Sequence, residues 1–154
     1  MEIRSDDLTG PRIAALLALH LREMRGASPP GTVFALDLSA LRGPDVSVWS
    51  AWDGEALLGC GALRELGPDA AEIKSLRTDR GHLRKGVATA LLDLIVAVAR
   101  ARGYTRLSLE TGSGPAFDAA LSLYRRRGFR EGEPFGDYAV SPFNRFLHLD
   151  LTGS

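Results

Sequence analysis

The 154 residues of this chain fit one domain, 1–154, which is large enough to enclose an apolar core. Hydrophobic residues make up 45% and charged residues 25%, as is typical of soluble globular proteins, and 19 basic residues balance 19 acidic ones. Because the charges balance, the protein has no overall electrostatic field that would attract nucleic acid or an anionic membrane. The single Cys60 allows no internal disulfide, and the chain has neither a signal-like N-terminus nor an apolar run of membrane-spanning length. We therefore expect a cytoplasmic protein that binds neither nucleic acid nor membrane.

The first predicted elements are a short strand, a helix and a loop. Residues 1–4 predict the strand, and the polar cluster after it offers caps for the helix. Apolar residues then recur at helical spacing, namely Ile13, Leu16, Leu17, Leu21 and Met24. The helix should end near Gly26. Residues 27–32, rich in Pro and Gly, predict a loop, and residues 37–41 a short helical turn.

Three strands should follow as an antiparallel meander. Residues 46–52 and 56–65 are separated by Asp53-Gly54, a strong hairpin signal between apolar segments. A second turn at residues 67–69 leads into a strand over about 71–78.

A short basic loop then leads into a second long helix. The helix is indicated by a stripe of apolar residues, which are Val87, Leu91, Leu94, Ile95 and Val98. It should stop at Gly103, before a strand over 105–110. Strand, helix and strand over residues 71–110 predict a parallel, right-handed crossover.

The remaining residues predict one more helix and two closing strands. Pro115 suits the first turn of a helix whose Phe117, Ala120, Leu121 and Tyr124 lie along one side before Gly128 ends it. Residues 129–131 and 145–151 predict the strands. The fold class is therefore α/β, with a mixed sheet flanked by helices.

Residues 72–92 place a strand, the basic loop and the start of a helix in succession, an order that builds an anion site. Arg84 and Lys85 add charge there. Gly81 and Gly86 have the spacing of a nucleotide-triphosphate loop, but Val87 and Ala88 follow where Lys and a hydroxyl are needed. Residues 59–64 begin a dinucleotide fingerprint but end in Arg instead of Gly. Both of these phosphate loops are therefore set aside.

The segment Leu83-Arg84-Lys85-Gly86-Val87-Ala88 resembles the acetyl-CoA loop of the GNAT acetyltransferase superfamily, [QR]-x-x-G-x-[GA]. Leu83 stands where Gln or Arg is usual, but its main-chain N–H remains available to a pyrophosphate. The resemblance continues through residues 106–112, through 120–129, which look like the element A-x-x-L-Y-x-x-x-G-F, and through 134–138.

The resemblance implies a mostly antiparallel mixed sheet with one parallel strand–helix–strand crossover and helices on both faces. It also implies an N-acetyltransferase that moves an acetyl group from acetyl-CoA, without a metal, to a primary amine of a small molecule or peptide by direct attack in a ternary complex. The implied cofactor-binding residues are Leu76, Arg77, Thr78, Leu83, Arg84, Lys85, Gly86, Val87, Ala88 and Thr89.

Two residues inherit catalytic roles from this resemblance. Glu72, fourteen residues before Gly86, corresponds to the general base; alternatively it faces solvent and pairs with a cation such as Lys74. Tyr124 corresponds to the residue that protonates or positions the CoA sulfur; alternatively it is a core aromatic residue. Phe117 stands where the family often has an Asn that binds the CoA arm, and we expect Thr111 or Ser113 to replace it.

The acceptor and the number of subunits stay open at this stage. The resemblance assigns the acceptor groove to residues 20–45 and 134–144, whose polar side chains would suit an amino acid, a polyamine or a peptide N-terminus. GNAT proteins are often dimers, so a homodimer is left open. The competing functions are a non-catalytic acyl-CoA-binding regulatory module and an anion-binding scaffold without CoA selectivity.

Overall fold

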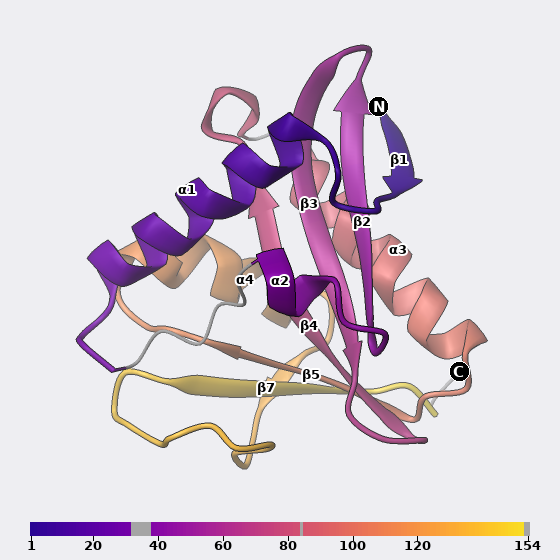
Figure 1. Ribbon diagram of the computed structural model, residues 1–154. Coiled ribbons are helices and arrows are strands. Elements are labelled where there is room, and N and C mark those ends of the chain that lie inside the picture. The colour runs from indigo at the N-terminus through magenta and orange to yellow at the C-terminus, as the bar shows by residue number, and fades with distance from the viewer. Residues whose placement is uncertain (32–37, 84, 153–154) are drawn as a thin grey trace.

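The computed structural model describes residues 1–31, 38–83 and 85–152 (Figure 1). The strands are β1 (Glu2–Ser5), β2 (Val46–Asp53), β3 (Ala56–Glu65), β4 (Ala70–Thr78), β5 (Arg106–Thr111), β6 (Arg130–Glu131) and β7 (Arg145–Asp150). The helices are α1 (Pro11–Ala27), α2 (Leu38–Leu41), α3 (Val87–Ala101) and α4 (Asp118–Arg126), with single 3-10 turns η1 (Arg80–His82) and η2 (Pro115–Phe117). These elements confirm the predicted order. Thr32, Asp37 and Arg84, each part of a predicted segment, lie outside the described residues.

The strands form one seven-stranded sheet in the order β1-β2-β3-β4-β5-β7-β6. Among the strand pairs in the described part of the chain, β4 and β5 alone run parallel, and α3 connects them. The other pairs are antiparallel, including the β2–β3 hairpin that closes at the predicted Asp53-Gly54 turn. The predicted mixed, mostly antiparallel sheet is confirmed.

Helices cover both faces of the sheet because its central strands are apolar on both sides. Leu91, Leu92 and Ile95 of α3 pack with Ala71 and Ile73 of β4 in one buried cluster. On the other face, residues of α1 and α2 pack with β2 and β3 in a second cluster, which contains Ile13, Leu16, Leu17, Leu41, Val48 and Ala62. The two clusters make a three-layer structure, with α1 and α2 in front of the sheet in Figure 1.

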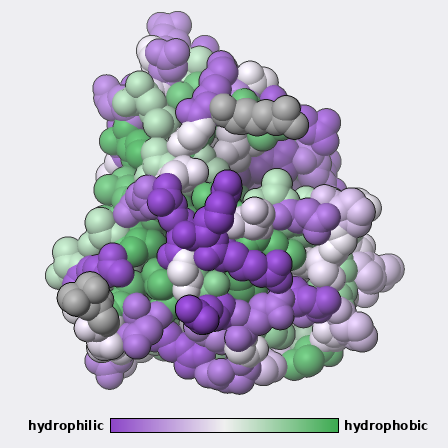
Figure 2. Space-filling view, turned by 180° about the vertical axis from the view of Figure 1, so that it is seen from behind, coloured by the Kyte–Doolittle hydropathy of each residue, from purple (hydrophilic) through white to green (hydrophobic). Residues whose placement is uncertain are grey.

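Figure 2 views the molecule from behind, on the side of the sheet opposite α1. Figure 2 shows hydrophilic side chains across the middle of this face, with apolar ones in patches beside them. This pattern fits helices that turn their apolar stripe inward, since the buried residues of α3 are Val87, Leu91, Leu92, Ile95 and Ala99.

The parallel pair β4–β5 separates part of the way along. Its pairing runs from Ala70 opposite Arg106 to Glu72 opposite Ser108 and goes no further. Beyond that point β4 carries an irregularity in its pairing with β3, and Ser75 there has a left-handed φ of 54°. A bulge of this kind bends a strand away from a regular ladder. Figure 1 shows β5 and β7 running at a wide angle to the upper part of β4.

Candidate active site

A cavity of about 180 Å³ occupies the opening between β4 and β5. Its walls come from both strands, from η2 and α4, from α1 and from one residue before β7. The residues that line it include His20, Met24, Ser28, Lys74, Ser75, Leu76, Arg77, Glu110, Thr111, Phe117, Tyr124 and Phe143. The cavity therefore lies beyond the paired part of two parallel strands, where open α/β sheets bind ligands.

The predicted anion loop leads directly into α3. Gly86, the N-cap residue, precedes the helix with a left-handed φ of 78° and has no side chain to cap the N–H groups of the first turn. The main-chain N–H groups of Val87, Ala88 and Thr89 are thus oriented as a helix start that can receive an anion. Leu83 is exposed, which fits a contribution from its main chain rather than its side chain.

The end of β4 and the start of α3 are held close together by a glycine in β3. A Cβ on Gly59 would lie 2.6 Å from the carbonyl oxygen of Arg77 and 2.9 Å from Cγ1 of Val87. Only a residue without a side chain permits this approach. Of the predicted cofactor-binding residues, Leu76 and Arg77 line the cavity, whereas Thr78, Leu83 and residues 85–89 are not among its lining residues.

A carboxylate of α1 ties that helix to the same region. Glu23 pairs with Arg77 of β4 and, at 2.7 Å, with Arg80 of η1. Arg77 is 11% exposed, so its pair with Glu23 is well shielded, while Arg80 is exposed. The pairs fix the C-terminal half of α1 over the end of β4 and bring His20 and Met24 to the cavity.

Tyr124 lies in the cavity wall and also contributes to the core. It is buried, its ring packs edge-on against Phe129 at a centroid distance of 5.8 Å, and burial raises the pKa of its hydroxyl to about 12. Tyr124 is therefore a core aromatic residue and a cavity-lining residue at the same time, so the two interpretations from the sequence do not exclude each other. A hydroxyl with this pKa stays protonated at neutral pH, so it has a proton to donate.

Phe117, which stands where related sequences often have an Asn, is buried against Phe143 with the ring centroids 5.4 Å apart. Of its two suggested replacements, Ser113 donates its hydroxyl to the carbonyl oxygen of Phe143 at 2.8 Å. Thr111 lines the cavity. Thr111 is therefore the better-placed hydroxyl for a ligand.

Glu72 is 1% exposed, so the alternative of a solvent-facing residue is wrong. Its carboxylate accepts a hydrogen bond from the hydroxyl of Tyr138 at 2.6 Å and pairs with Arg64 across the β3–β4 ladder at 3.7 Å. Lys74, on the same face of β4, donates to the Tyr138 hydroxyl oxygen at 2.6 Å. Burial and the Glu72 carboxylate raise the pKa of Tyr138, so this tyrosine links Lys74 to Glu72 as a neutral bridge.

Glu110, which the sequence analysis did not identify as a base, faces the cavity from β5. Burial raises the pKa of its carboxyl to about 7, against the lowering effects of a hydrogen bond from the Asn144 amide and the positive charge of Lys74. A carboxylate that titrates near neutral pH is well matched to general-base work. In the sequence, Glu110 could have been identified by its position at the C-terminal end of the strand that runs parallel to β4.

Two further cavity-lining residues keep a buried polar atom without a hydrogen-bond partner among the described residues. They are His20, at Nδ1, and Ser75, at Oγ. Burial lowers the pKa of His20 to about 4, so its imidazole is neutral at physiological pH. Unpaired buried polar atoms are rare in folded proteins and need an explanation. A ligand in the cavity would supply one.

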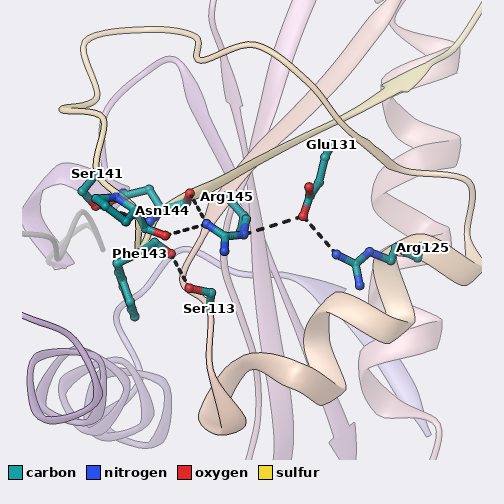
Figure 3. Close-up of polar contacts among 8 residues, drawn as sticks. Ser113, Arg125, Glu131, Ser141, Phe143, Asn144 and Arg145 are labelled. Atoms are coloured by element: carbon teal, nitrogen blue, oxygen red, sulfur yellow. Dashed lines mark hydrogen bonds and ion pairs between the residues drawn. The ribbon is translucent and has the colours of Figure 1, made fainter.

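The segment that holds Asn144 and Phe143 is fastened from two sides (Figure 3). Ser113, after β5, bonds the carbonyl of Phe143, and Ser141 bonds the side chain of Asn144. Figure 3 also shows Glu131 of β6 between two arginines, Arg145 of β7 at 3.8 Å and Arg125 of α4 at 3.0 Å. The Ser113 contact holds the main chain of Phe143, which lines the cavity, and the Ser141 contact holds the Asn144 side chain, whose amide bonds Glu110.

Within residues 1–31, 38–83 and 85–152, no three His, Cys, Asp or Glu side chains gather as a metal site would require. None of the helices in the same ranges is long and apolar enough to cross a membrane.

Comparison with known proteins supports an acetyltransferase fold and family. A model of the acetyltransferase (GNAT) family matches residues 13–129. The uncharacterized N-acetyltransferase YsnE of Bacillus subtilis is 50% identical over 151 residues, which cover 98% of this chain and 100% of that protein.

Two solved structures extend the comparison to the fold. A Klebsiella pneumoniae protein provisionally assigned as an acyl-CoA N-acyltransferase is 28% identical, with a TM-score of 0.81 and 97% of each chain covered. A Bacillus subtilis acetyltransferase in complex with CoA is 21% identical, with a TM-score of 0.72 and 97% of each chain covered, and this likeness concerns the fold alone.

Proposed function

The chain belongs to the GNAT acetyltransferase family, and we propose that it transfers an acetyl group from acetyl-CoA to a primary amine of a small molecule or peptide, by direct attack in a ternary complex. The observation that carries this proposal is the cavity in the split between β4 and β5. It brings a carboxyl group with a pKa of about 7, Glu110, into the same lining as a protonated hydroxyl, Tyr124.

The donor would bind along the split strands toward the start of α3. Main-chain N–H groups of Val87, Ala88 and Thr89 would hold the pyrophosphate, helped by the positive end of the helix dipole and by Lys85. The arm that carries the thioester would run between β4 and β5, with Thr111 beside it. Support for CoA as the cosubstrate comes also from the CoA complex that shares this fold.

The reaction needs a neutral amine, a polarised carbonyl and a protonated leaving sulfur. Glu110 accepts one proton from the acceptor ammonium, which frees the nitrogen lone pair. Main-chain N–H groups between Leu76 and Thr78, beyond the last β4–β5 pair, donate to the thioester oxygen. As the C–N bond forms and the C–S bond breaks, Tyr124 gives its proton to the sulfur. The nitrogen loses its second proton as the amide forms, and a proton from solvent restores the Tyr124 hydroxyl.

Glu72, the base predicted from the sequence, and Glu110 are alternative candidates for the general base. Its carboxylate lies behind Tyr138 and is held by Arg64, whereas that of Glu110 faces the cavity itself. This geometry favours Glu110 for direct contact with the amine. Glu72 would then act through Tyr138 and Lys74, by holding both side chains in place.

The test is release of free thiol from acetyl-CoA in the presence of a panel of amines. We expect turnover that depends on the amine, and a larger loss of activity in Glu110→Gln than in Glu72→Gln. Full activity after both Glu110→Gln and Tyr124→Phe would remove the proposed roles. The competing function, a non-catalytic acyl-CoA-binding regulatory module, expects tight CoA binding without turnover on any amine.

A further inference from the structure

Glu110, the proposed base, is held by an amide from a distant part of the chain. Its Oε2 accepts a hydrogen bond from Nδ2 of Asn144, a buried residue just before β7. Glu110 itself lines the cavity. Within residues 1–31, 38–83 and 85–152, no hydrogen bond to its second oxygen, Oε1, is found. The carboxylate is therefore anchored through one oxygen, and the other can meet a ligand.

Ser141 sets which end of the Asn144 amide faces Glu110. The main-chain N–H of Asn144 donates to the Ser141 hydroxyl oxygen at 3.3 Å, and the same hydroxyl donates its proton to Oδ1 of Asn144. Because Oδ1 is engaged in this way, the NH2 group of the amide points at the carboxylate. The reverse orientation would bring two acceptors, Oδ1 and the ionised carboxylate, against each other. The turn over residues 141–144 thus presents a donor to Glu110 in a fixed direction.

A donor in this position favours the ionised form of Glu110. Burial raises the pKa of the carboxyl to about 7, and the hydrogen bond from Asn144 is the largest of the effects that lower it. A hydrogen bond to a charged group is stronger than one between neutral groups. Without the amide, burial would remain while the main opposing effect was lost, so the carboxyl would ionise at higher pH.

Other charged and titratable groups surround Glu110, and a substitution at Asn144 leaves them in place. They come from α1, β4, α4, the segment before β7 and β7 itself, and are His20, Glu72, Lys74, Arg77, Tyr124, Tyr138 and Arg145. After burial and the Asn144 hydrogen bond, Lys74 lowers the pKa of Glu110 and Glu72 raises it. The amide is neutral, so its removal tests the hydrogen bond without changing the net charge around the carboxyl.

We infer that Asn144 is a positioning residue for the base: it anchors Oε2 of Glu110 so that Oε1 meets the acceptor amine, and Ser141 holds the amide in the orientation that does this. This inference rests on the proposed acetyl transfer with Glu110 as its base. A base must lie within hydrogen-bond reach of the proton that it takes, and a carboxylate held in that geometry loses less freedom on reaching it. No proton passes through Asn144 or Ser141, which act on the direction and the ionisation of Glu110.

Asn144→Leu removes the donor and keeps a branched side chain. The rising limb of kcat/KM against pH should move upward by about one pH unit, because the carboxylate loses a charged hydrogen bond. On the high-pH plateau, where Glu110 is ionised in both proteins, kcat/KM should stay roughly tenfold lower, because the carboxylate is no longer held in place. The acceptor amine titrates alike in both experiments, so the comparison isolates Glu110. Asn144→Ala, a smaller replacement, carries the same test if Asn144→Leu fails to fold.

Variants of Ser141 test the orientation of the amide. Ser141→Ala should move the rising limb upward by less than Asn144→Leu does, because the amide remains but can turn over. Ser141→Thr, which keeps the hydroxyl, should restore the midpoint of the unaltered enzyme. Ser113→Ala is the matched control, since it releases the neighbouring Phe143 carbonyl without touching the amide, and it should not move the limb.

The ionisation of Glu110 can also be read directly, from the NMR shift of its carboxyl carbon against pH, with Glu110→Gln identifying the signal. This titration needs no turnover, so it reports on a variant with very low activity. An unshifted midpoint in Asn144→Leu, an equal shift in Ser113→Ala, or a loss that vanishes on the plateau would overturn the inference and leave acetyl transfer standing. Thiol release with none of the amines would instead remove the proposed function, and this inference with it.

Discussion

Replacing Glu110 by Gln keeps the shape of the side chain and an oxygen that accepts from Asn144, but removes the carboxylate. If Glu110 is the base, the substitution should lower kcat/KM by about 10²- to 10⁴-fold, as is usual for loss of a positioned base. The unaltered enzyme should gain activity as pH rises through about 7, where the carboxyl ionises. This step should be missing from the pH profile of Glu110→Gln.

The same substitution should change stability in a direction opposite to its effect on activity. Burial raises the folded pKa of Glu110 from 4.5 to about 7, so folding becomes less favourable as pH rises between these values, and the loss is complete above 7. Each pKa unit is worth about 1.4 kcal/mol, which would give about 3 kcal/mol for a fully buried group. Because the side chain is only partly buried, solvent screening reduces this to about 1–2 kcal/mol.

Glu110→Gln should therefore be more stable than the unaltered protein by about 1–2 kcal/mol at pH 8 and equally stable near pH 4, where both side chains are neutral. The measurements are denaturant unfolding at both pH values and thiol release over pH 5.5–9. Glu55→Gln, an exposed carboxylate in the β2–β3 turn, is the matched control and should change neither. An unchanged pH profile, or equal stability at pH 8, would refute the reasoning about Glu110.

Three other substitutions address the donor site, the acid and the cavity wall. Gly86→Ala imposes a side chain on a left-handed φ of 78°, which should destabilise the fold by about 1–2 kcal/mol and weaken CoA binding in a titration. Gly67→Ala, with open space at its Cβ and no left-handed φ, should do neither, and equal effects would contradict the assignment. Tyr124→Phe should lower kcat about tenfold or more with little change in CoA affinity, since only the proton donor is lost, and an unchanged kcat would rule out this role. Ser113→Ala removes the bond to the Phe143 carbonyl, so the acceptor KM should rise and the free energy of unfolding fall by about 1 kcal/mol. Kinetics and denaturant unfolding check this last expectation, which fails if both values stay the same.

Sequence alone determined the order of the elements, because each depends on local patterns. Apolar residues at helical spacing defined α1 and α3, Asp53-Gly54 defined the hairpin, and Gly86 marked the start of α3. The anion loop could be predicted for the same reason, because a strand, a glycine-containing loop and a helix start are consecutive in the chain. Tyr124 was predicted from its segment, and it lies in the cavity wall.

Only the tertiary structure decided which polar groups meet in the cavity. His20, Lys74, Glu110 and Asn144 come from α1, β4, β5 and the segment before β7, and no spacing in the sequence links them. Their meeting depends on the bulge at Ser75, which separates β4 from β5, and on long-range contacts that close the wall. Burial then sets the chemistry, since the pKa of Glu110 is raised by its surroundings and not by its neighbours in the chain.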